Sequence, residues 1–439
     1  MKRVLIISYY WPPSGGIAVL RCLKWAKYLR NFGWEPVVFT AENAHYPTFD
    51  SSNFKDIPEG LTVLKGKIIE PYSLYKKFTG QAKNANVNNV FYVQDDKPGI
   101  AHQLSVWIRS NFFIPDARKM WIRPSVKYLL KYLKENPVDA ILSDGPPHSN
   151  TRIATLLKKE TGIPWLADFQ DPWTQVDYYQ MLTLTKWADK KHRMLEQEVF
   201  KYADKTTIVS ETWKTELESI GAKNVSVIPW GYDPEDFENI EPKQVEGFTF
   251  MHLGIMGLDR NPEVFFQVLK ELTEEVKGFK SALQLHFYGQ VDFSVQTSFT
   301  EAGIQNHVKL PGSVNRDLAL AFTAGSPVLL LLLNKQHNAK GRIPGKLFEY
   351  LAARRPIIVL GPTDSDVSKI VANSGSGRTF EYEDREGIKK GVLELFEKYK
   401  NGGLTKPIDN QINQYSVVNT SRQISEFLNE ISSSKKQNC

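Results

Sequence analysis

Three residues at the start of one predicted helix could together bind a nucleotide. Gly345, Lys346 and Glu349 follow an apolar strand predicted over 327–333. A glycine lets a ligand approach the backbone, and the first turn of a helix attracts phosphate through unpaired N–H groups and its dipole. Lys346 adds a full cation, and Glu349, three residues later, projects from the same face and could bind sugar hydroxyls. An ordinary helix start with solvated side chains is an equal alternative.

A second loop, at residues 254–262, repeats this arrangement earlier in the same half of the chain. Gly254 ends a predicted strand, Arg260 follows, and Pro262 occupies the first turn of the next predicted helix. Arg260 could bind a phosphate through two parallel hydrogen bonds. An arginine near a helix start with no ligand is the alternative.

A third loop, at residues 9–16, joins the first predicted strand, 4–8, to the first predicted helix, 17–32. Gly15 and Gly16, just before that helix, could bring the backbone close to an anion or could simply permit a tight turn. The loop lacks the G-x-G-x-x-G spacing, so a dinucleotide cofactor is not expected.

Three polar residues in the N-terminal half are candidates for catalytic roles. Asp168 ends a strand predicted over 164–168, where a carboxylate is unfavourable unless it is paired or lies at the edge of an open site. Asp171 precedes a proline and is also a common type of turn or cap residue. His148 follows another predicted strand, and its imidazole could serve catalysis or merely satisfy a local hydrogen bond.

The elements that position these residues alternate between strand and helix, which predicts an α/β fold with two halves of similar size. We expect domains at 1–233 and 234–415, followed by a C-terminal helical segment at 416–439. Doubly wound parallel sheets bind ligands at the carboxyl ends of their strands. Two such domains facing each other would therefore place the glycine loops on either side of a cleft.

The composition is that of a folded soluble protein, because 41% of the 439 residues are hydrophobic and 24% are charged. A net charge of +6 suits an anionic ligand or an anionic membrane surface, but it is too small to indicate nucleic acid as a partner. The signatures of P-loop ATPases, α/β-hydrolases, zinc proteases and EF-hands are missing. With only Cys22 and Cys439, we expect no disulfide scaffold, no Cys-based metal site and a reducing cytosol.

Any membrane contact is expected to be peripheral. No apolar run is long enough to span a bilayer, and the N-terminus does not resemble a signal peptide. Basic residues gather in one N-terminal region: Lys76, Lys77, Arg109, Arg118, Lys119 and Arg123. The aromatic and basic stretch 105–123 could dock on an anionic bilayer, or could form an aromatic-rich acceptor-side subdomain.

Taken together, these segments resemble glycosyltransferase family 4, whose members have the GT-B fold. The resemblance covers nearly the whole chain and rests on residues 10–16, 168–173, 254–262, 343–352 and 355–358. It implies two facing Rossmann-like domains with a cleft between them and a final helix that crosses back onto the N-terminal domain. It also implies a nucleotide-sugar donor bound mainly by the C-terminal domain, and transfer with retention of the anomeric configuration.

The resemblance assigns donor-binding residues in the second half of the chain. Lys346 and Arg260 would bind the diphosphate, and Glu349 would hold the ribose hydroxyls. The family commonly carries two glutamates separated by seven residues, and counting back from Glu349 places Gly341 at the first of them. The contacts that this first glutamate usually makes to the donor sugar are therefore not expected from Gly341.

Other residues take their expected places from the same resemblance. Gly312 and Val314 would lie near the base, while Gly15 and Gly16 would face the diphosphate from the other domain. Asp168 lies near the position where the family often has a histidine close to the anomeric centre. We therefore expect Asp168 to shape the transfer site.

The expected function is transfer of a sugar from a nucleotide-sugar to a glycan, a lipid-linked or another acceptor in cell-envelope polysaccharide biosynthesis. The expected location is the cytoplasm, at the inner face of the membrane. Lys346, Arg260 and the helix N-terminus would stabilise the leaving nucleoside diphosphate without a metal or other cofactor. A nucleotide-sugar epimerase or other isomerase, and a non-catalytic sugar-nucleotide-binding protein, are the alternatives. We expect Lys346→Ala to abolish transfer while the protein stays folded.

Overall fold

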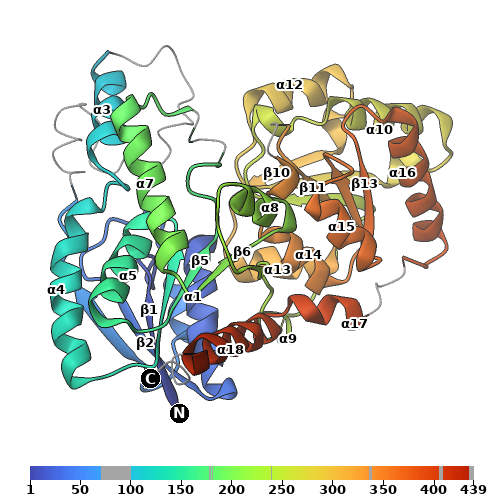
Figure 1. Ribbon diagram of the computed structural model, residues 1–439. Helices are drawn as coiled ribbons and strands as arrows, with labels where there is room; N and C mark the ends of the chain where they lie inside the picture. The colour runs from blue at the N-terminus through green and yellow to red at the C-terminus, as the bar shows by residue number, and fades with distance from the viewer. Residues whose placement is uncertain are drawn as a thin grey trace. The chain divides into compact units, whose positions relative to one another are not determined.

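The computed structural model describes residues 1–70, 100–176, 179, 181–238, 240–335, 339–404 and 409–434. The basic residues Lys76 and Lys77 lie outside these ranges. The chain forms two compact units, shown in Figure 1. Unit 1 comprises Met1–Pro229 together with Thr420–Cys439, and unit 2 comprises Trp230–Asn419.

A seven-stranded parallel sheet forms the centre of unit 1, in the order β3-β2-β1-β4-β5-β6-β7. In chain order the strands are β1 (Lys2–Ile7), β2 (Trp34–Ala41), β3 (Thr62–Gly66), β4 (Ala140–Gly145), β5 (Trp165–Phe169), β6 (Lys205–Ile208) and β7 (Val225–Val227). The strands β4 and β5 are buried along their whole length. Burial on both faces explains why the central strands appear in the sequence as nearly continuous apolar runs.

The helices of unit 1 connect successive parallel strands. They are α1 (Ile17–Tyr28), α3 (Ile100–Phe112), α4 (Lys119–Glu135), α5 (His148–Thr161), α7 (Lys186–Tyr202) and α8 (Glu211–Ser219), with short 3₁₀ turns at η1 (Leu29–Phe32) and η2 (Ser51–Asp56). The helix predicted over 17–32 is therefore α1 followed by η1. It ends at Gly33, whose φ of 81° is the left-handed conformation that glycine adopts easily.

The last helix, α18 (Val417–Ser434), packs on the core of unit 1. Ile424, Leu428 and Ile431 share a buried cluster with Val4 and Trp25. These three positions recur every three or four residues, so they form one apolar face of the helix. The C-terminal end of the chain is thereby tied to its first strand.

A six-stranded parallel sheet forms the centre of unit 2, in the order β10-β9-β8-β11-β12-β13. The strands are β8 (Phe248–Leu253), β9 (Leu283–Tyr288), β10 (Val308–Gly312), β11 (Val328–Leu332), β12 (Ile357–Leu360) and β13 (Gly377–Phe380). Leu330 and Leu332 of β11 join one buried cluster, while Leu329 and Leu331 join another. Because successive strand residues point to opposite faces, this sheet has a core on each side.

Helices again connect the strands of unit 2. They are α9 (Glu235–Glu238), α10 (Glu263–Glu275), α11 (Phe279–Ala282), α12 (Phe293–Glu301), α13 (Arg316–Gly325), α14 (Lys346–Ala353), α15 (Asp366–Asn373), α16 (Arg385–Lys400) and α17 (Asp409–Ile412), with 3₁₀ turns at η4 (Leu258–Arg260), η5 (Gln305–His307), η6 (Ala339–Gly341) and η7 (Asn413–Tyr415). Two parallel sheets with crossover helices confirm the predicted α/β class. Within the described residues, no helix is long and apolar enough to cross a membrane.

Candidate functional site

Backbone hydrogen bonds join the carboxyl ends of neighbouring strands of unit 2, each from the residue after one strand to the last residue of the next. The N–H of Gly254, after β8, donates to the carbonyl of Tyr288 at 2.7 Å. The N–H of Gly289, after β9, donates to the carbonyl of Gly312, at the end of β10, at 2.9 Å. The structure therefore brings the Gly254–Arg260 loop and the Gly312 loop together along one sheet edge, where ligands bind in such folds.

The helix α14 begins at this same edge. Leu347, Phe348 and Leu351 are buried in the core, and the opposite face, with Lys346 and Glu349, is half-buried. Gly345 is the residue before the helix, as predicted, but the N–H groups of Leu347 and Phe348 already donate to backbone carbonyls at 3.0 and 3.1 Å. The attraction for phosphate here therefore depends more on the Lys346 side chain than on these amides.

The side chain of Lys346 reaches the end of strand β8. Its Nζ donates a hydrogen bond to the carbonyl of Leu253, and the N–H of Leu253 donates to the hydroxyl of Tyr350 at 3.0 Å. The next residue, Gly254, has a φ of +101°, and a Cβ there would lie 2.9 Å from Lys346 Nζ. Glycine is therefore needed at 254 both for its backbone conformation and for the approach of the lysine.

Arg260 adds a second cation close to Lys346. Its Nη1 contacts the carbonyl of Ile255 at 3.4 Å, and its Nε lies 3.6 Å from Asp259. Burial lowers the pKa of Lys346 to about 7, the charge of Arg260 acts in the same direction, and Glu349 opposes both. A bound anion would offset the burial and the repulsion from Arg260 that disfavour the charged form of Lys346.

Glu349, the expected ribose-binding residue, is engaged by Arg316 in this structure. Arg316 Nη1 lies 2.6 Å from Glu349 Oε1, and Arg316 Nη2 donates to Asp236 Oδ2 at 3.1 Å. Sequence reasoning missed both partners. Asp236 lies 80 residues before Arg316, so only the fold brings them together.

Two further predicted donor residues lie on the loop that leads to Arg316. Gly312 ends β10 with a φ of +79°, which a residue with a side chain adopts only with strain. Val314 is half-buried and packs against the apolar cluster of unit 2 that contains Leu347. The position of the first family glutamate, Gly341, is a buried residue at the end of η6 and offers no carboxylate.

In unit 1, the two predicted glycines precede α1 for different reasons. Gly16 is exposed and has a φ of +82°, so the backbone itself favours glycine there. Gly15 is buried, its N–H donates to the carbonyl of Thr48 at 2.9 Å, and a Cβ would crowd Thr48 and Asp50 at 3.1 and 3.2 Å. No side chain in the described residues caps the start of α1.

Asp168 is almost completely buried and fully engaged in an ion pair. Arg21 Nε and Nη2 contact its two carboxylate oxygens at 2.7 and 2.8 Å, and the hydroxyl of Thr207 donates to it at 2.6 Å. Arg21 also donates to the carbonyls of Ile228 and Pro229, at the end of unit 1. These contacts favour the paired alternative for Asp168, and its role in shaping a transfer site stays a prediction.

His148 begins α5 and is 6% exposed. Its ring stacks on Trp173 with centroids 4.2 Å apart, and neither ring nitrogen has a hydrogen-bond partner in the described part of the chain. Burial, followed by the charge of His192, lowers the pKa of His148 to about 3, so the ring is neutral. Asp171 lies half-buried in the loop after β5. Catalytic roles for both residues stay predictions.

Sequence reasoning missed one further buried carboxyl group, that of Asp144 at the end of β4. It accepts hydrogen bonds from Ser8, Asn150 and Gln170 at 3.1, 2.7 and 3.0 Å. Burial, with the nearby charge of Asp168, raises the pKa of Asp144 to about 7. The signal in the sequence was its place at the end of a buried strand, the same signal that singled out Asp168.

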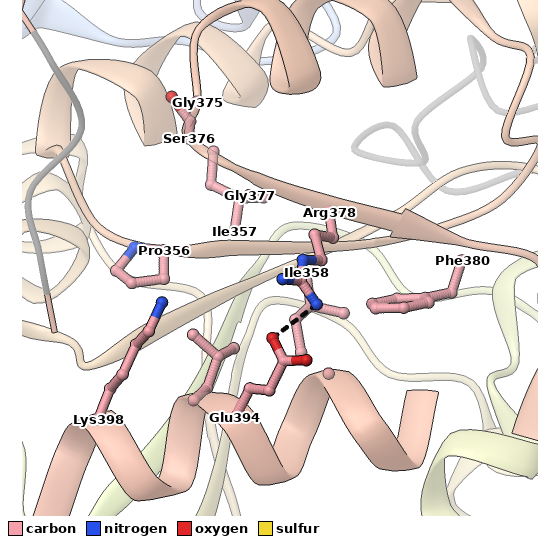
Figure 2. Close-up of a pocket in the computed structure, with 12 residues that line it drawn as sticks. Pro356, Ile357, Ile358, Gly375, Ser376, Gly377, Arg378, Phe380, Glu394 and Lys398 are labelled. Atoms are coloured by element: carbon pink, nitrogen blue, oxygen red, sulfur yellow. Dashed lines mark ion pairs between the residues drawn. The ribbon is translucent and has the colours of Figure 1, made fainter. Parts of the chain in front are cut away.

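A separate cavity of about 250 Å³ lies between β12, β13 and α16 (Figure 2). Its lining includes Pro356, Ser376 and Lys398, and an ion pair of 2.7 Å joins Arg378 to Glu394 across it. None of the predicted donor residues lines this cavity. In the described ranges, no three His, Cys, Asp or Glu side chains gather as metal ligands.

Comparison with known proteins identifies the fold and, over part of the chain, a similar family. Residues 81–236 match the model of the family described as Glycosyltransferase Family 4. A search of curated protein sequences finds no match. Among solved structures, the chain is similar to a glycosyltransferase from Rickettsia africae (TM-score 0.60, 16% identity, 98% of each chain covered).

Two other similar structures are of proteins that bind or release a uridine nucleotide. One is Anabaena Alr3699/HepE in complex with UDP-glucose (TM-score 0.57, 10% identity, 100% of each chain covered). The other is an α,α-trehalose-phosphate synthase (UDP-forming) from Burkholderia vietnamiensis (TM-score 0.57, 12% identity, covering 99% of this chain and 100% of that one). At these identities the likeness shows the fold.

The fold and the family model together define an enzyme of the glycosyltransferase class with the GT-B fold. Over residues 81–236, the chain is similar to glycosyltransferase family 4.

Proposed function

We propose that this enzyme transfers a sugar from a nucleotide-sugar to a glycan, lipid-linked or other acceptor with retention of the anomeric configuration, in cell-envelope polysaccharide biosynthesis. The observation that carries the proposal is the position of Lys346. This half-buried cation lies at the carboxyl edge of the unit 2 sheet, with Arg260 beside it. The UDP-glucose complex of the similar HepE structure supports a nucleotide-sugar as the donor.

The chemistry of the step needs stabilisation of a leaving nucleoside diphosphate. Negative charge develops on the diphosphate as the bond to the anomeric carbon breaks, and Lys346 and Arg260 are fixed cations at the site where it would lie. Glu349 lies three residues after Lys346 on the same helix, so the two side chains are neighbours on its surface. This arrangement suits diphosphate at one end and ribose hydroxyls at the other.

The proposed activity is tested by incubating the protein with a panel of UDP-, GDP- and other nucleotide-sugars and a simple hexoside acceptor. We expect one donor to give a glycosylated product and free nucleoside diphosphate, detected by mass spectrometry, with the donor's anomeric configuration in the product by NMR. Inversion in the product would contradict the stereochemical part. Conversion of the donor into an isomeric nucleotide-sugar, with no acceptor present, would instead identify an epimerase or other isomerase.

A peripheral contact with an anionic membrane, for a lipid-linked acceptor, is part of the proposal. Helix α3 carries exposed apolar side chains at Leu104, Ile108 and Phe112, which recur every four residues on one face. The exposed Trp187 lies on α7, which is tied to α3 through Asn111. Lysines and arginines neighbour this face along the chain, as expected of a helix that lies on anionic lipid.

Replacing Ile108 and Phe112 together by glutamate should weaken binding to vesicles of phosphatidylcholine and phosphatidylglycerol by at least about fivefold. The reason is that both the buried apolar area and the attraction to anionic lipid would fall. Sedimentation with vesicles measures this change. Phe293→Glu, at a 79% exposed aromatic residue of unit 2, is the matched control and should bind as the unmodified protein does. If the double variant binds the vesicles as tightly as the unmodified protein does, the proposal that this face of α3 contacts the membrane is wrong.

A further inference from the structure

Arg316 links two carboxylates that come from distant parts of unit 2. It begins α13, while Glu349 lies on α14 and Asp236 lies on α9. One terminal nitrogen of the guanidinium contacts Glu349 at 2.6 Å, and the other donates to Asp236 at 3.1 Å. The side chains are 26% exposed for Arg316, 19% for Glu349 and 7% for Asp236. Partial shielding from water strengthens such ion pairs.

The shape of the guanidinium makes this link directional. Its N–H groups point along fixed directions in one plane. When Asp236 holds one terminal nitrogen, the plane of the group is restricted, and the other nitrogen presents its hydrogen to Glu349 along a defined line. An ammonium group, which is a compact point charge with rotating hydrogens, would not fix the direction in this way.

The charge of Arg316 is stable over the whole range in which proteins are assayed. Burial lowers its pKa, but the carboxylates of Glu349 and Asp236 more than offset this effect and raise the pKa above its usual value. Glu349 therefore faces a permanent cation.

We infer that Arg316 is a positioning residue of the donor site: anchored by Asp236, it holds one carboxylate oxygen of Glu349 so that the other is directed at the ribose hydroxyls of a bound nucleotide. This inference rests on the proposed function, because it requires a nucleotide at this sheet edge. It assigns Arg316 no contact with phosphate, which remains the task of Lys346 and Arg260. The effect of Arg316 is therefore specific to the ribose.

The test compares nucleotides with and without the ribose 2′-hydroxyl. The full chain and its Arg316→Met variant are titrated calorimetrically with UDP, 2′-deoxy-UDP, GDP, 2′-deoxy-GDP and pyrophosphate. For the base that binds, the unmodified protein should prefer the ribonucleotide about tenfold, the value of one hydrogen bond to a charged group. In Arg316→Met this preference should fall to about twofold, while the affinity for pyrophosphate stays the same.

Three further variants separate positioning from a general loss of structure. Asp236→Asn should give an intermediate preference, because Arg316 keeps its charge and loses its anchor. Arg316→Lys should remain folded and still fail to restore the full preference. Arg378→Met removes an exposed arginine that pairs with Glu394 at the cavity of the same unit, and it should leave every affinity unchanged.

Two results would overturn the inference. An unchanged ribose preference in Arg316→Met would show that Glu349 does not need this partner. Tighter binding of ribonucleotides by Arg316→Met would show that the ion pair blocks the site. Failure of the proposed function has a different signature, since the unmodified protein would then bind no nucleoside diphosphate, whatever its base.

Discussion

Replacing Lys346 by methionine should lower the rate of sugar transfer about 100- to 1000-fold while the protein remains folded. Methionine keeps most of the apolar stem and removes only the charge that contacts the carbonyl of Leu253. Losing one fixed electrostatic stabiliser of a transition state typically has an effect of this size. The measurement is kcat/KM for the donor, with the melting temperature as the check on folding. Transfer at the unmodified rate would contradict the assignment of Lys346.

The same lysine predicts how donor affinity depends on pH. With a pKa of about 7 in the free protein, Lys346 is charged below pH 7 and loses its proton above it. Binding a diphosphate requires the charged form, so the Kd of a nucleotide-sugar, whose diphosphate has no group that titrates near neutral pH, should be constant below pH 7. Above pH 7 it should rise by up to about tenfold per pH unit. Titrations from pH 6 to 9 measure this slope, and the Lys346→Met variant should have none.

The affinity for the donor should fall above pH 7, whereas the contribution of Lys346 to the stability of the free protein should rise. The pKa of Lys346 is lower in the folded protein than its ordinary value of 10.5, so the unfolded chain binds more protons between pH 7 and 10.5. The contribution of Lys346 to the free energy of unfolding therefore rises with pH across this window. Opposite slopes of nucleotide affinity and stability are the combined signature of a phosphate-binding lysine held in a partly desolvated position.

Replacing Arg21 by methionine should destabilise the protein by about 3–5 kcal/mol, the usual effect of removing one partner of a buried ion pair. Arg21 and Asp168 have side chains that are 2% and 0% exposed, so the carboxylate would remain buried without its cation. The melting temperature and urea midpoint of unit 1 measure this loss. Arg193→Met, which removes an exposed i,i+4 pair with Asp189, is the matched control and should change stability by less than about 1 kcal/mol.

The variant Asp168→Asn separates the two roles that remain open for this residue. If Asp168 serves mainly as the partner of Arg21, Asp168→Asn should lower stability and leave kcat within a few-fold of the unmodified value. A loss of more than about 100-fold in kcat at unchanged stability would instead place Asp168 in the transfer step.

Some parts of this site could be predicted from the sequence because their causes are local. A strand, a glycine, a cation and a helix follow each other within a few residues at Gly345 and Lys346, so the pattern alone predicted the position of α14. The same holds for Gly254, which the sequence placed at a strand end. The structure added the reason for this glycine, namely the approach of Lys346 Nζ to its backbone.

Other parts could not be predicted because their partners are remote in the sequence. Arg21 and Asp168 are 147 residues apart, and Arg316 and Asp236 are 80 apart. Sequence reasoning recognised that a carboxylate at Asp168 needs a partner or an open edge, but a single sequence contains nothing that names the partner. The sequence likewise predicted Glu349 on one face of α14. Its ion pair with Arg316 could not be predicted, because that pair depends on how α9 and α13 pack.

The central claim, that unit 2 binds a nucleotide-sugar through Lys346, is tested most directly by thermal shift. The unmodified protein and Lys346→Met are melted with a panel of UDP-, GDP- and other nucleotide-sugars. A donor at about 100 times its Kd adds roughly 2.7 kcal/mol, which raises the melting temperature of a unit of this size by about 5–10 °C. We predict such a shift for at least one donor with the unmodified protein and none with Lys346→Met. No shift with any donor, or an equal shift in both proteins, would contradict the claim.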